Sequence, residues 1–373
     1  IHLSGYSNLC VYFMIKSLNE LKENGKCVYI TPYEFLNTGY GVVVKEYLLK
    51  KRMLKSIIKF DNSLSLFSDA ITTSCILVFE NKRHDYIEFN TIDSLEQISG
   101  HVYGASVKLR YEEIKAEEKW NTYFRDDSIH EYKNLVEFCT VAKVKRGIAT
   151  GNNSYFTLSR PRIEELGLSS QVCVKCITKS PDVKKMVFTD DAFDELENQG
   201  KRVYIFDGEK ADTQNDLDYI KWGEENGADQ SYLNRHRTPW YQVENKQTAP
   251  IWISVFCRDR LKVIRNETEA KNLTTFHGLF TDSDDKAFQD ILFCYLLTPI
   301  CQEILFENKR EYGDGLQKFE PGDLNRSRII DISVIAEEDR RKILNLYQKI
   351  KLEEDASKWI EQLNDIFTRY IIP

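Results

Sequence analysis

The first 80 residues alternate between helical and strand patterns of apolar residues. A spacing of three to four residues predicts a helix over residues 6–24, which Gly25 ends, and a second helix follows over residues 40–55. Three short apolar runs, at residues 27–30, 56–60 and 72–79, predict buried strands. Helices that alternate with such strands indicate a doubly wound α/β sheet. About eleven residues separate the last two strands, so we expect them to pair antiparallel, with the last strand at the sheet edge.

The rest of the chain changes character twice. Residues 81–130 are charged and irregular, which indicates a linker or peripheral segment, and short strands separated by turns then predict a mixed α+β domain. An amphipathic, charge-laced pattern from about residue 337 predicts C-terminal helices. We therefore expect four parts, at residues 1–85, 86–130, 131–335 and 336–373. The strands expected in the third part are residues 141–145, 171–177, 202–206, 251–256 and 261–265.

Composition narrows the class of protein. The chain has 373 residues, of which 42% are hydrophobic and 29% charged, as in ordinary globular proteins. We find no uninterrupted apolar run of about 18 residues and expect no membrane partner. Nine cysteines are scattered, and Cys173 and Cys176 form a single C-x-x-C pair, whereas a zinc site usually needs four ligands. We expect reduced thiols, no metal and a cytoplasmic location.

Charge is distributed in blocks along the chain. The net charge of −7 argues against a general polyanion binder. Yet residues 141–185 hold nine Lys or Arg against three Asp or Glu, whereas residues 188–230 hold four against thirteen. Residues 233–265 are again basic, with seven against two. A basic face on an acidic protein is sufficient to bind a phosphate backbone.

The predicted sheet carries a recognisable set of motifs. Residues 6–9 read YSNL, residues 25–36 read G-K-x-V-x-I-T-P-x-x-F-L, and residues 66–79 read LF-S-x-A-x-T-T-S-C-I-L-V-F. Ligands of open α/β sheets bind beyond the carboxyl ends of the strands, where the loop between the last two predicted strands begins. Phe67 in that loop either stacks on a planar ligand or packs as an ordinary loop aromatic.

These motifs resemble the second half of the catalytic domain of γ-type N6-adenine DNA methyltransferases of restriction-modification systems. The resemblance implies the C-terminal half of a Rossmann-like sheet that binds S-adenosylmethionine, with an antiparallel last strand and a target-recognition domain after it. It implies that Phe67 stacks on the flipped target adenine. It also implies that Asn8 lies near the active-site end of a helix, and that Pro32 and Phe35 shape the site wall.

A second motif lies at residues 145–156. Its glycines and small residues predict a tight loop, which Lys145 and Arg146 precede. Basic side chains contact phosphates and Asn reads adenine edges, although the residues taken by themselves favour a solvated turn. The stretch resembles the RGIxTGxNxxF signature that opens the recognition domain of these methyltransferases. The resemblance implies DNA contacts from Lys145, Arg146, Thr150, Asn152 and Asn153.

A third motif lies at residues 233–241 and combines arginines with aromatic residues. Arg235 and Arg237 could bind phosphate or guanine, and Trp240 and Tyr241 offer flat surfaces, although a solvated basic face with two core aromatics explains them too. The segment resembles the arginine-bearing stretch ending in Pro-Trp-Tyr of the same recognition domains. The later segment around Asn272 also resembles that family, which places this residue near DNA.

The resemblance makes the chain the C-terminal part of a site-specific adenine methyltransferase. Asn is never followed by Pro in the 373 residues, so the family's Asn-Pro-Pro-Tyr or Asn-Pro-Pro-Phe motif is absent, as is its glycine-bearing cofactor turn. We therefore expect the S-adenosylmethionine site to lie mostly outside this chain, and this chain alone to be inactive. The expected partners are double-stranded DNA and, as an option, a cognate restriction endonuclease. A stand-alone DNA-specificity subunit and a fused restriction-modification enzyme stay open as alternatives.

Overall fold

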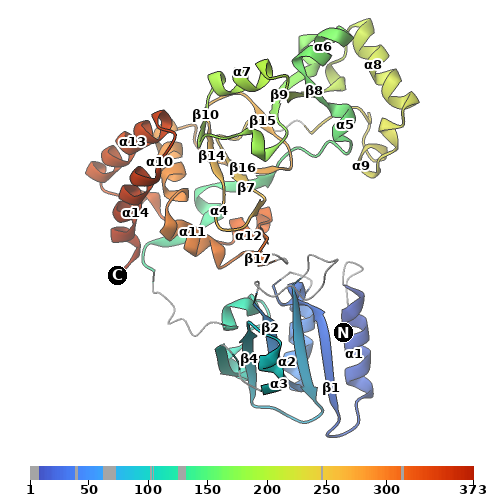
Figure 1. Cartoon of the computed structure of the whole chain (residues 1–373), viewed down its shortest axis with the longest axis vertical. Helices are drawn as coiled ribbons and strands as arrows, with labels where there is room; N and C mark the ends of the chain where they lie inside the picture. The colour runs from blue at the N-terminus through green and yellow to red at the C-terminus, as the bar shows by residue number, and fades with distance from the viewer. Residues whose placement is uncertain are drawn as a thin grey trace. The chain divides into compact units, whose positions relative to one another are not determined.

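The computed structural model describes residues 8–37, 41–61, 73–100, 103, 105–124, 132–244, 247–311 and 315–373 (Figure 1). The chain divides into two compact units, each described here by itself. Unit 1 comprises residues 1–130 and 307–318, and unit 2 comprises residues 131–306 and 319–373. Unit 1 thus also takes in residues 307–318, which the sequence analysis placed in the third part.

Unit 1 is built on a five-stranded sheet in the order β1-β3-β2-β4-β5. Its core contains the buried faces of α1 and α2 together with the inner residues of the sheet. Residues 310–311 and 317–318 add a short antiparallel pair. The elements are α1 (Leu9–Glu20), β1 (Lys26–Pro32), α2 (Gly41–Lys51), β2 (Leu54–Phe60), β3 (Ser74–Glu80), β4 (Tyr86–Ile92), α3 (Glu96–Gly100), β5 (Ala105–Arg110), β17 (Arg310–Glu311) and β18 (Gln317–Lys318).

The antiparallel pairing of β2 and β3 confirms the expectation from the short connection between them. Ile57 lies opposite Leu77 in this pair, and β3 is antiparallel to β1 as well, with Val28 opposite Val78. The expected edge position of β3 is wrong, because β3 lies between β1 and β2. Six of its seven residues are buried, which explains why its sequence is the most continuously apolar of the three.

The prediction of a linker at residues 86–130 is wrong for the residues that the structure describes. β4 pairs parallel with β2, and β5 pairs antiparallel with β4, so both strands extend the sheet. After β5, two aromatic residues pack against the sheet. Trp120 and Phe124 lie edge-on to Phe89 of β4, with ring centres 6.1 and 5.3 Å from its own. β4 and β5 lie in a stretch rich in charged residues, which is why the sequence analysis assigned the whole stretch to a linker.

Unit 2 contains a five-stranded sheet in the order β10-β14-β12-β16-β7 and a four-stranded sheet in the order β15-β9-β11-β8. The strands are β6 (Leu135–Glu137), β7 (Lys143–Arg146), β8 (Thr157–Ser159), β9 (Cys173–Ile177), β10 (Val187–Phe188), β11 (Arg202–Phe206), β12 (Ile251–Ser254), β13 (Phe256–Cys257), β14 (Val263–Asn266), β15 (Lys271–Asn272), β16 (Phe276–Phe280) and β19 (Arg328–Ile330). The helices are α4 (Phe138–Val141), α5 (Asn153–Phe156), α6 (Arg160–Leu166), α7 (Asp190–Asn198), α8 (Gln214–Glu225), α9 (Tyr232–Arg235), α10 (Lys286–Leu296), α11 (Pro299–Phe306), α12 (Pro321–Asn325), α13 (Glu337–Leu352) and α14 (Ser357–Ile371).

The five-stranded sheet separates two hydrophobic cores of unit 2. Ile251 and Ile253 on β12 face the core that the C-terminal helices cover, whereas Trp252 between them faces the core of the four-stranded sheet. All three side chains are fully buried, so this strand is apolar on both faces, as in a sheet covered on both sides. β7 is an edge strand of this sheet, and it leads directly into the segment predicted to contact DNA.

The C-terminal helices belong to unit 2, so the expected boundary at residues 335 and 336 is not a domain boundary. Ile343 and Tyr347 on α13, and Leu363 and Phe367 on α14, are buried in the same core as α10. The predicted helical stretch is broken by residues 353–356, and Ala356 is itself buried. Among the described residues, no single helix is long and apolar enough to cross a membrane; α10 and α11, bent by 74°, meet that test only as a pair.

Candidate nucleic-acid interface

The loop that joins β7 to α5, residues 147–152, is held on one side by backbone contacts; we refer to it as the glycine loop. The N–H of Ile148 donates to the carbonyl of Asn272 at 2.9 Å, and Ile148 forms a parallel bridge with Leu273. A Cβ on Gly147 would lie 2.1 Å from the carbonyl oxygen of Leu273. Only glycine allows the two backbones to approach so closely.

Arg237 holds the glycine loop from its other side. Its guanidinium donates to the carbonyls of Ala149 and Thr150, the latter at 3.0 Å, and to Oδ1 of Asn234 at 3.3 Å. Partial burial lowers the pKa of Arg237 below its ordinary value, but an arginine remains charged at neutral pH. Arg237 therefore positions the loop backbone, in addition to any contact that it makes with a ligand.

Asn234 and Gly151 form the closest approach between the glycine loop and α9. Asn234 is fully buried, and its amide donates to the carbonyl of Ala228 at 2.7 Å. Gly151 has φ of +78°, and a Cβ there would lie 2.5 Å from Oδ1 of Asn234. The left-handed conformation and the contact both require glycine. Asn234 was not among the predicted site residues, because its sequence neighbours give no sign that it is buried.

The polar side chains of the loop and of α5 largely bond to one another. Asn152 caps α5, since its Oδ1 accepts from the N–H of Tyr155 at 3.3 Å and from the hydroxyl of Ser154 at 2.6 Å. Thr150 is buried, and its hydroxyl donates to Oδ1 of Asn153 at 2.5 Å. Asn153 itself is exposed. Of these predicted residues, Asn153 is therefore the best presented to a ligand outside the protein.

Three predicted cations lie at the surface around this loop. Lys145 and Arg146 are the last two residues of β7, and Arg235 ends α9. The Nζ of Lys145 lies 5.0 Å from the ring centre of Phe280, and an Arg146 nitrogen lies 3.6 Å from Oε1 of Glu244. A partly exposed ion pair of this length is weak, so Arg146 can exchange Glu244 for a phosphate at little cost.

Trp240 and Tyr241 are half-buried and pack within the protein. The ring of Trp240 lies 5.2 Å from Tyr155, its Nε1 donates to Glu224 at 3.0 Å, and its ring centre is 5.7 Å from that of Tyr241. A Cβ on Gly223 would lie 2.7 Å from the ring of Trp240, so any larger residue at this position would collide with that ring. Trp240 thus packs against Tyr155 of α5 and against α8, and Tyr241 packs against Trp240.

Asn272 lies under the glycine loop. Its side chain is buried, and its amide donates to the carbonyl of Phe276 at 2.8 Å. Its own carbonyl accepts from Ile148. The structure thus brings Asn272 to the predicted site, but as a support for the loop. The expected proximity of Asn272 to DNA rests on the family resemblance and stays a prediction.

Two of the residues predicted for the site in unit 1, Asn8 and Pro32, lie at one end of its sheet. Asn8 caps α1, accepting from the N–H of Cys10 at 3.2 Å, and Pro32 ends β1. Phe35 is buried in the core of the unit. Phe67 lies outside the described residues, so its role stays a prediction.

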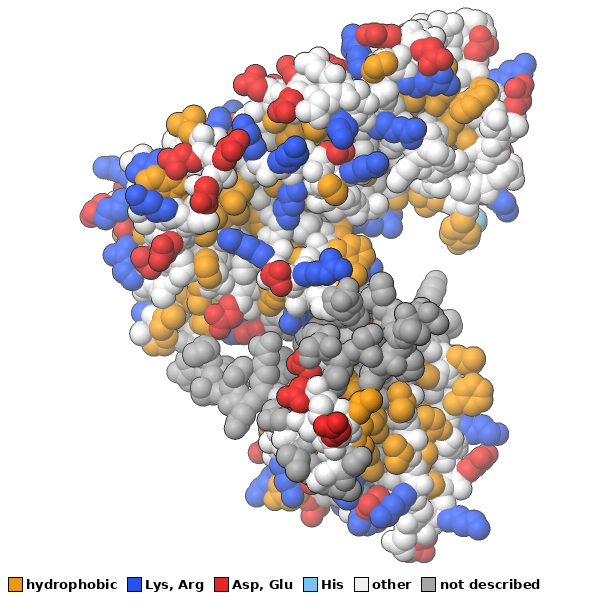
Figure 2. All heavy atoms as spheres, in the orientation of Figure 1, with side chains coloured by type: hydrophobic (Ala, Val, Ile, Leu, Met, Phe, Trp, Pro, Cys, Tyr) orange, Lys and Arg blue, Asp and Glu red, His pale blue; other side chains and the backbone are white. Residues whose placement is uncertain are grey.

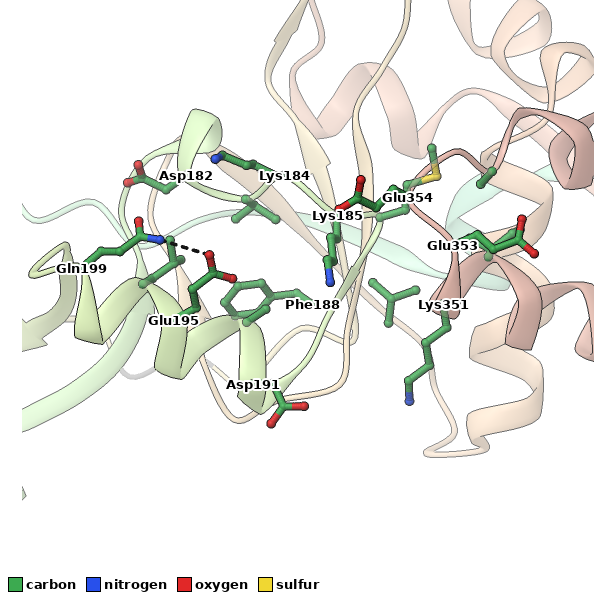
Figure 3. Close-up of a pocket in the computed structure, with 17 residues that line it drawn as sticks. Asp182, Lys184, Lys185, Phe188, Asp191, Glu195, Gln199, Lys351, Glu353 and Glu354 are labelled. Atoms are coloured by element: carbon green, nitrogen blue, oxygen red, sulfur yellow. Dashed lines mark hydrogen bonds between the residues drawn. The ribbon is translucent and has the colours of Figure 1, made fainter.

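A cavity of about 530 Å³ lies between α7 and the chain that follows α13 (Figure 3). Figure 3 shows Lys184 and Lys185 among carboxylates of both walls, including Glu195 and Glu353, all of them exposed. This mixture of signs does not favour an anion over a cation. None of the residues that line the cavity belongs to the glycine loop or to α9, so the cavity is separate from that loop.

The structure also bears on metal and thiol chemistry. All nine cysteines are free thiols, and burial raises the pKa of Cys173 to about 11. Within the described ranges, no group of three His, Cys, Asp or Glu side chains is placed to hold a metal ion. His277 is buried in the part of the chain expected to recognise DNA, residues 131–335. Its Nε2 lies 2.8 Å from the carbonyl oxygen of Phe319, which is a structural contact.

Comparisons with known proteins identify the family of the chain. A family model described as "Type II methyltransferase M.Eco57I, C-terminal domain" matches residues 118–364, and one described as "Eco57I restriction-modification methylase" matches residues 2–67. The Type II methyltransferase M.AccI of Acinetobacter calcoaceticus is 38% identical, over 98% of this chain and 71% of that protein. M.XamI of Xanthomonas campestris pv. amaranthicola is 25% identical, over 88% of this chain and 61% of that protein.

A solved structure shares the fold. The Type IIL restriction-modification enzyme MmeI, determined in complex with DNA, aligns with 99% of this chain and 50% of its own chain, with a TM-score of 0.63 and 11% identity. The mixed α/β fold is therefore one that a restriction-modification enzyme also adopts. Together with the family matches and the level of identity, this leads to one conclusion: the chain belongs to the Type II methyltransferases of restriction-modification systems.

Proposed function

We propose that this chain supplies the DNA-recognition part, and one side of the catalytic sheet, of a site-specific methyltransferase that transfers a methyl group from S-adenosylmethionine to N6 of adenine in duplex DNA. The observation that carries the proposal is the construction of the glycine loop. Buried Asn272 and half-buried Arg237 fix its backbone from two sides, while Lys145, Arg146 and Asn153 are exposed around it.

A rigid loop between exposed cations suits recognition of duplex DNA. Phosphate contacts from Lys and Arg set affinity and register, whereas base edges set specificity. The Asn153 side chain matches the edge of adenine, to which an amide can both donate and accept. Because Thr150 already bonds to its Oδ1, Asn153 is oriented before DNA arrives, which lowers the entropy lost on binding.

We propose that unit 1 holds the target adenine and takes part in the methyl transfer. The N6 amino group is inaccessible inside the duplex, so the target base must leave the stack. Phe67 is the proposed stacking residue on the strength of the motif resemblance, and Asn8 and Pro32 would border the site at the carboxyl end of β1. Phe35 would support this wall from the core. The preference for adenine over cytosine rests on the same resemblance.

The described residues do not form an S-adenosylmethionine site by themselves, so no catalytic step is derived through the cofactor. The face of α1 and β1 is apolar and exposed, with Leu9 at 67%, Phe13 at 60%, Val28 at 61% and Ile30 at 63% (Figure 2). Among the described strands, β1 pairs on one edge only. We propose that the cofactor-binding part of the enzyme covers this face and extends the sheet.

The first experiment selects duplexes that the chain retains from a random pool, then measures their affinity by fluorescence anisotropy across a salt series. We expect one short sequence, enriched over the pool, with an affinity that falls steeply with salt. A chain that retains no duplex, or retains all sequences equally, would overturn the recognition role. Arg146→Ala and Leu352→Ala, the latter at an exposed site on α13, provide the test and control variants.

The second experiment identifies the methylated base. A fusion that places the part of M.AccI unmatched by this chain in front of it would be incubated with the selected duplex and S-adenosylmethionine, and the nucleosides analysed by mass spectrometry. We expect N6-methyladenine. Methylcytosine would overturn the adenine assignment. In the active fusion, Phe67→Ala should lower methylation far more than binding; equal losses would count against base stacking.

A further inference from the structure

The start of α9 presents an aromatic ring to solvent beside the glycine loop. Tyr232 is 81% exposed, more than the exposed Tyr12, Phe13, Tyr86, Trp222 or Phe256. Two aromatic rings that contact each other in the same unit differ from it, since Tyr155 is buried and Trp240 is half-buried. A ring in this position is available to a ligand outside the protein, since its burial against such a ligand would bring stabilisation that the folded chain does not use.

The segment that carries Tyr232 is held firmly. Ser231 caps α9, its hydroxyl accepting from the N–H of Asn234 at 3.3 Å. Asn234 is fully buried and bonds to the carbonyl of Ala228, and Arg237 bonds to Asn234 and to the glycine loop. The ring of Tyr232 is therefore presented from a backbone that is fastened to the proposed recognition element.

The surroundings of Tyr232 favour a polyanion. Arg235 is exposed, and its Nε donates to the carbonyl of Gln230 at 2.6 Å, which fixes the base of the guanidinium. His236 is exposed too, with its ring 4.6 Å from that of Tyr232 and its Nδ1 2.6 Å from the Tyr232 carbonyl. The nearby carboxylate of Asp229 is partly buried and bonds to Gln230.

We propose that Tyr232 is a DNA-contacting wedge, whose ring stacks on a base at a step adjoining the site read by the glycine loop, while Arg235 and His236 contact the flanking phosphates. Aromatic or apolar side chains that enter a groove partly unstack a base step, and neighbouring cations hold the backbone on either side. The inference rests on the proposed DNA-recognition function and adds a residue that neither the motifs nor the family matches single out.

The test uses the full chain and the duplex obtained by selection. Tyr232→Ala should weaken binding of that duplex by about 10-fold, as the loss of one stacking contact does. Its salt slope should stay at the wild-type value, because no charge is removed. Tyr232→Phe should bind like the wild type, and Arg235→Ala should lower the salt slope by about one. Leu352→Ala, at another highly exposed residue of unit 2, serves as the control.

A fluorescent base gives a second readout. 2-Aminopurine placed along the selected duplex should brighten at one step when the wild-type chain binds, and this signal should disappear with Tyr232→Ala. Wild-type binding with an unchanged Tyr232→Ala affinity and fluorescence would overturn the wedge while leaving DNA recognition intact. Failure of the wild type to bind would instead remove the proposed function itself. Because the Tyr232 side chain is exposed, circular dichroism should show the variant folded like the wild type.

Discussion

The guanidinium of Arg237 donates to the main-chain carbonyl of Thr150 at 3.0 Å, across 87 positions of sequence. A second nitrogen of the same group reaches the carbonyl of Ala149. Two nitrogens of one planar guanidinium thus fix two consecutive peptide groups, and the compact ammonium of a lysine does not reproduce the spacing of these two donors. This relationship separates the arginines of the site into one that shapes the loop and two, Arg146 and Arg235, that remain at the surface.

Replacing Arg237 and replacing Arg146 should therefore impair DNA binding in different ways. Arg237→Ala leaves the carbonyls of the glycine loop without their donor, so we expect at least a 10-fold loss of affinity for the selected duplex with little change in salt slope. Arg146→Ala removes one phosphate contact, so we expect a smaller loss and a salt slope reduced by about one. Anisotropy titrations at several salt concentrations measure both quantities.

Arg237→Lys provides the control for charge, because it keeps the positive charge and loses the fork. It should resemble Arg237→Ala. If Arg237→Lys binds like the wild type, or if Arg237→Ala reduces the salt slope as much as Arg146→Ala does, then Arg237 acts on DNA as a charge rather than on the loop.

Gly151 offers a test of the loop's shape that involves no charge. Gly151→Ala places a Cβ 2.5 Å from Oδ1 of Asn234 in a backbone with φ of +78°. Gly200→Ala is the matched control, since its φ is +68° and nothing lies within 4 Å of its Cβ. Both variants should lose about 1 kcal/mol from left-handed strain, but only Gly151→Ala should also lose DNA affinity. Urea unfolding and anisotropy separate the two effects, and equal affinity losses would contradict the model of the loop.

Much of the fold was predictable because its signals are local. The strand expected at residues 202–206 coincides with β11, and the antiparallel pairing of β2 with β3 follows from the length of their connection. β4 and β5 were missed because they lie in a stretch rich in charged residues, and their packing is completed by Trp120 and Phe124, which follow β5 in the chain.

The residues of the candidate site likewise divide into those whose role the sequence reveals and those whose role it does not. Gly147 and Gly151 are recognisable as loop residues, and Lys145 and Arg146 as surface cations, because composition alone reveals those properties. The internal roles of Arg237 and Asn272 depend on partners 87 and 124 positions away, Thr150 and Ile148. Such partners cannot be derived from spacing. The exposure of Tyr232 was equally hidden, since an aromatic residue next to a cap is ordinarily assigned to the core.

The stability of unit 2 should depend strongly on the buried ion pair of Arg265 and Asp290. The two groups are 2.7 Å apart, and Arg265 also donates to Pro250, Asn266 and Gln289. Asp290→Asn leaves a buried guanidinium without its counter-ion, so we expect a loss of about 3 kcal/mol in the free energy of unfolding. Replacing both residues, as Arg265→Met with Asp290→Leu, should recover part of that loss. A single variant as stable as the wild type in urea would show that the pair is hydrated.

Lys45 should make the stability of unit 1 depend on pH in the alkaline range. It is 1% exposed, its Nζ donates to the carbonyls of Leu36 and Glu118 at 3.2 and 2.6 Å, and burial lowers its pKa to about 8. The unfolded chain, with an ordinary lysine pKa near 10.5, then binds the proton more tightly than the folded chain between these values. Stability relative to Lys45→Met should therefore rise with pH from about 8 to 10.5, by about 2 kcal/mol up to pH 9.5.

Trp120 allows this rise to be followed in unit 1 alone, because the other four tryptophans belong to unit 2. With 5-fluorotryptophan incorporated, the ¹⁹F resonance of Trp120, assigned by Trp120→Phe, reports urea unfolding of unit 1 at pH 7 and pH 9.5. Lys51→Met, at an exposed position of the same helix, should keep the wild-type pH dependence. If Lys45→Met shows that same dependence, the Lys45 ammonium is not perturbed, and the contacts that join α2 to residues 36 and 118 hold an ordinary charged lysine.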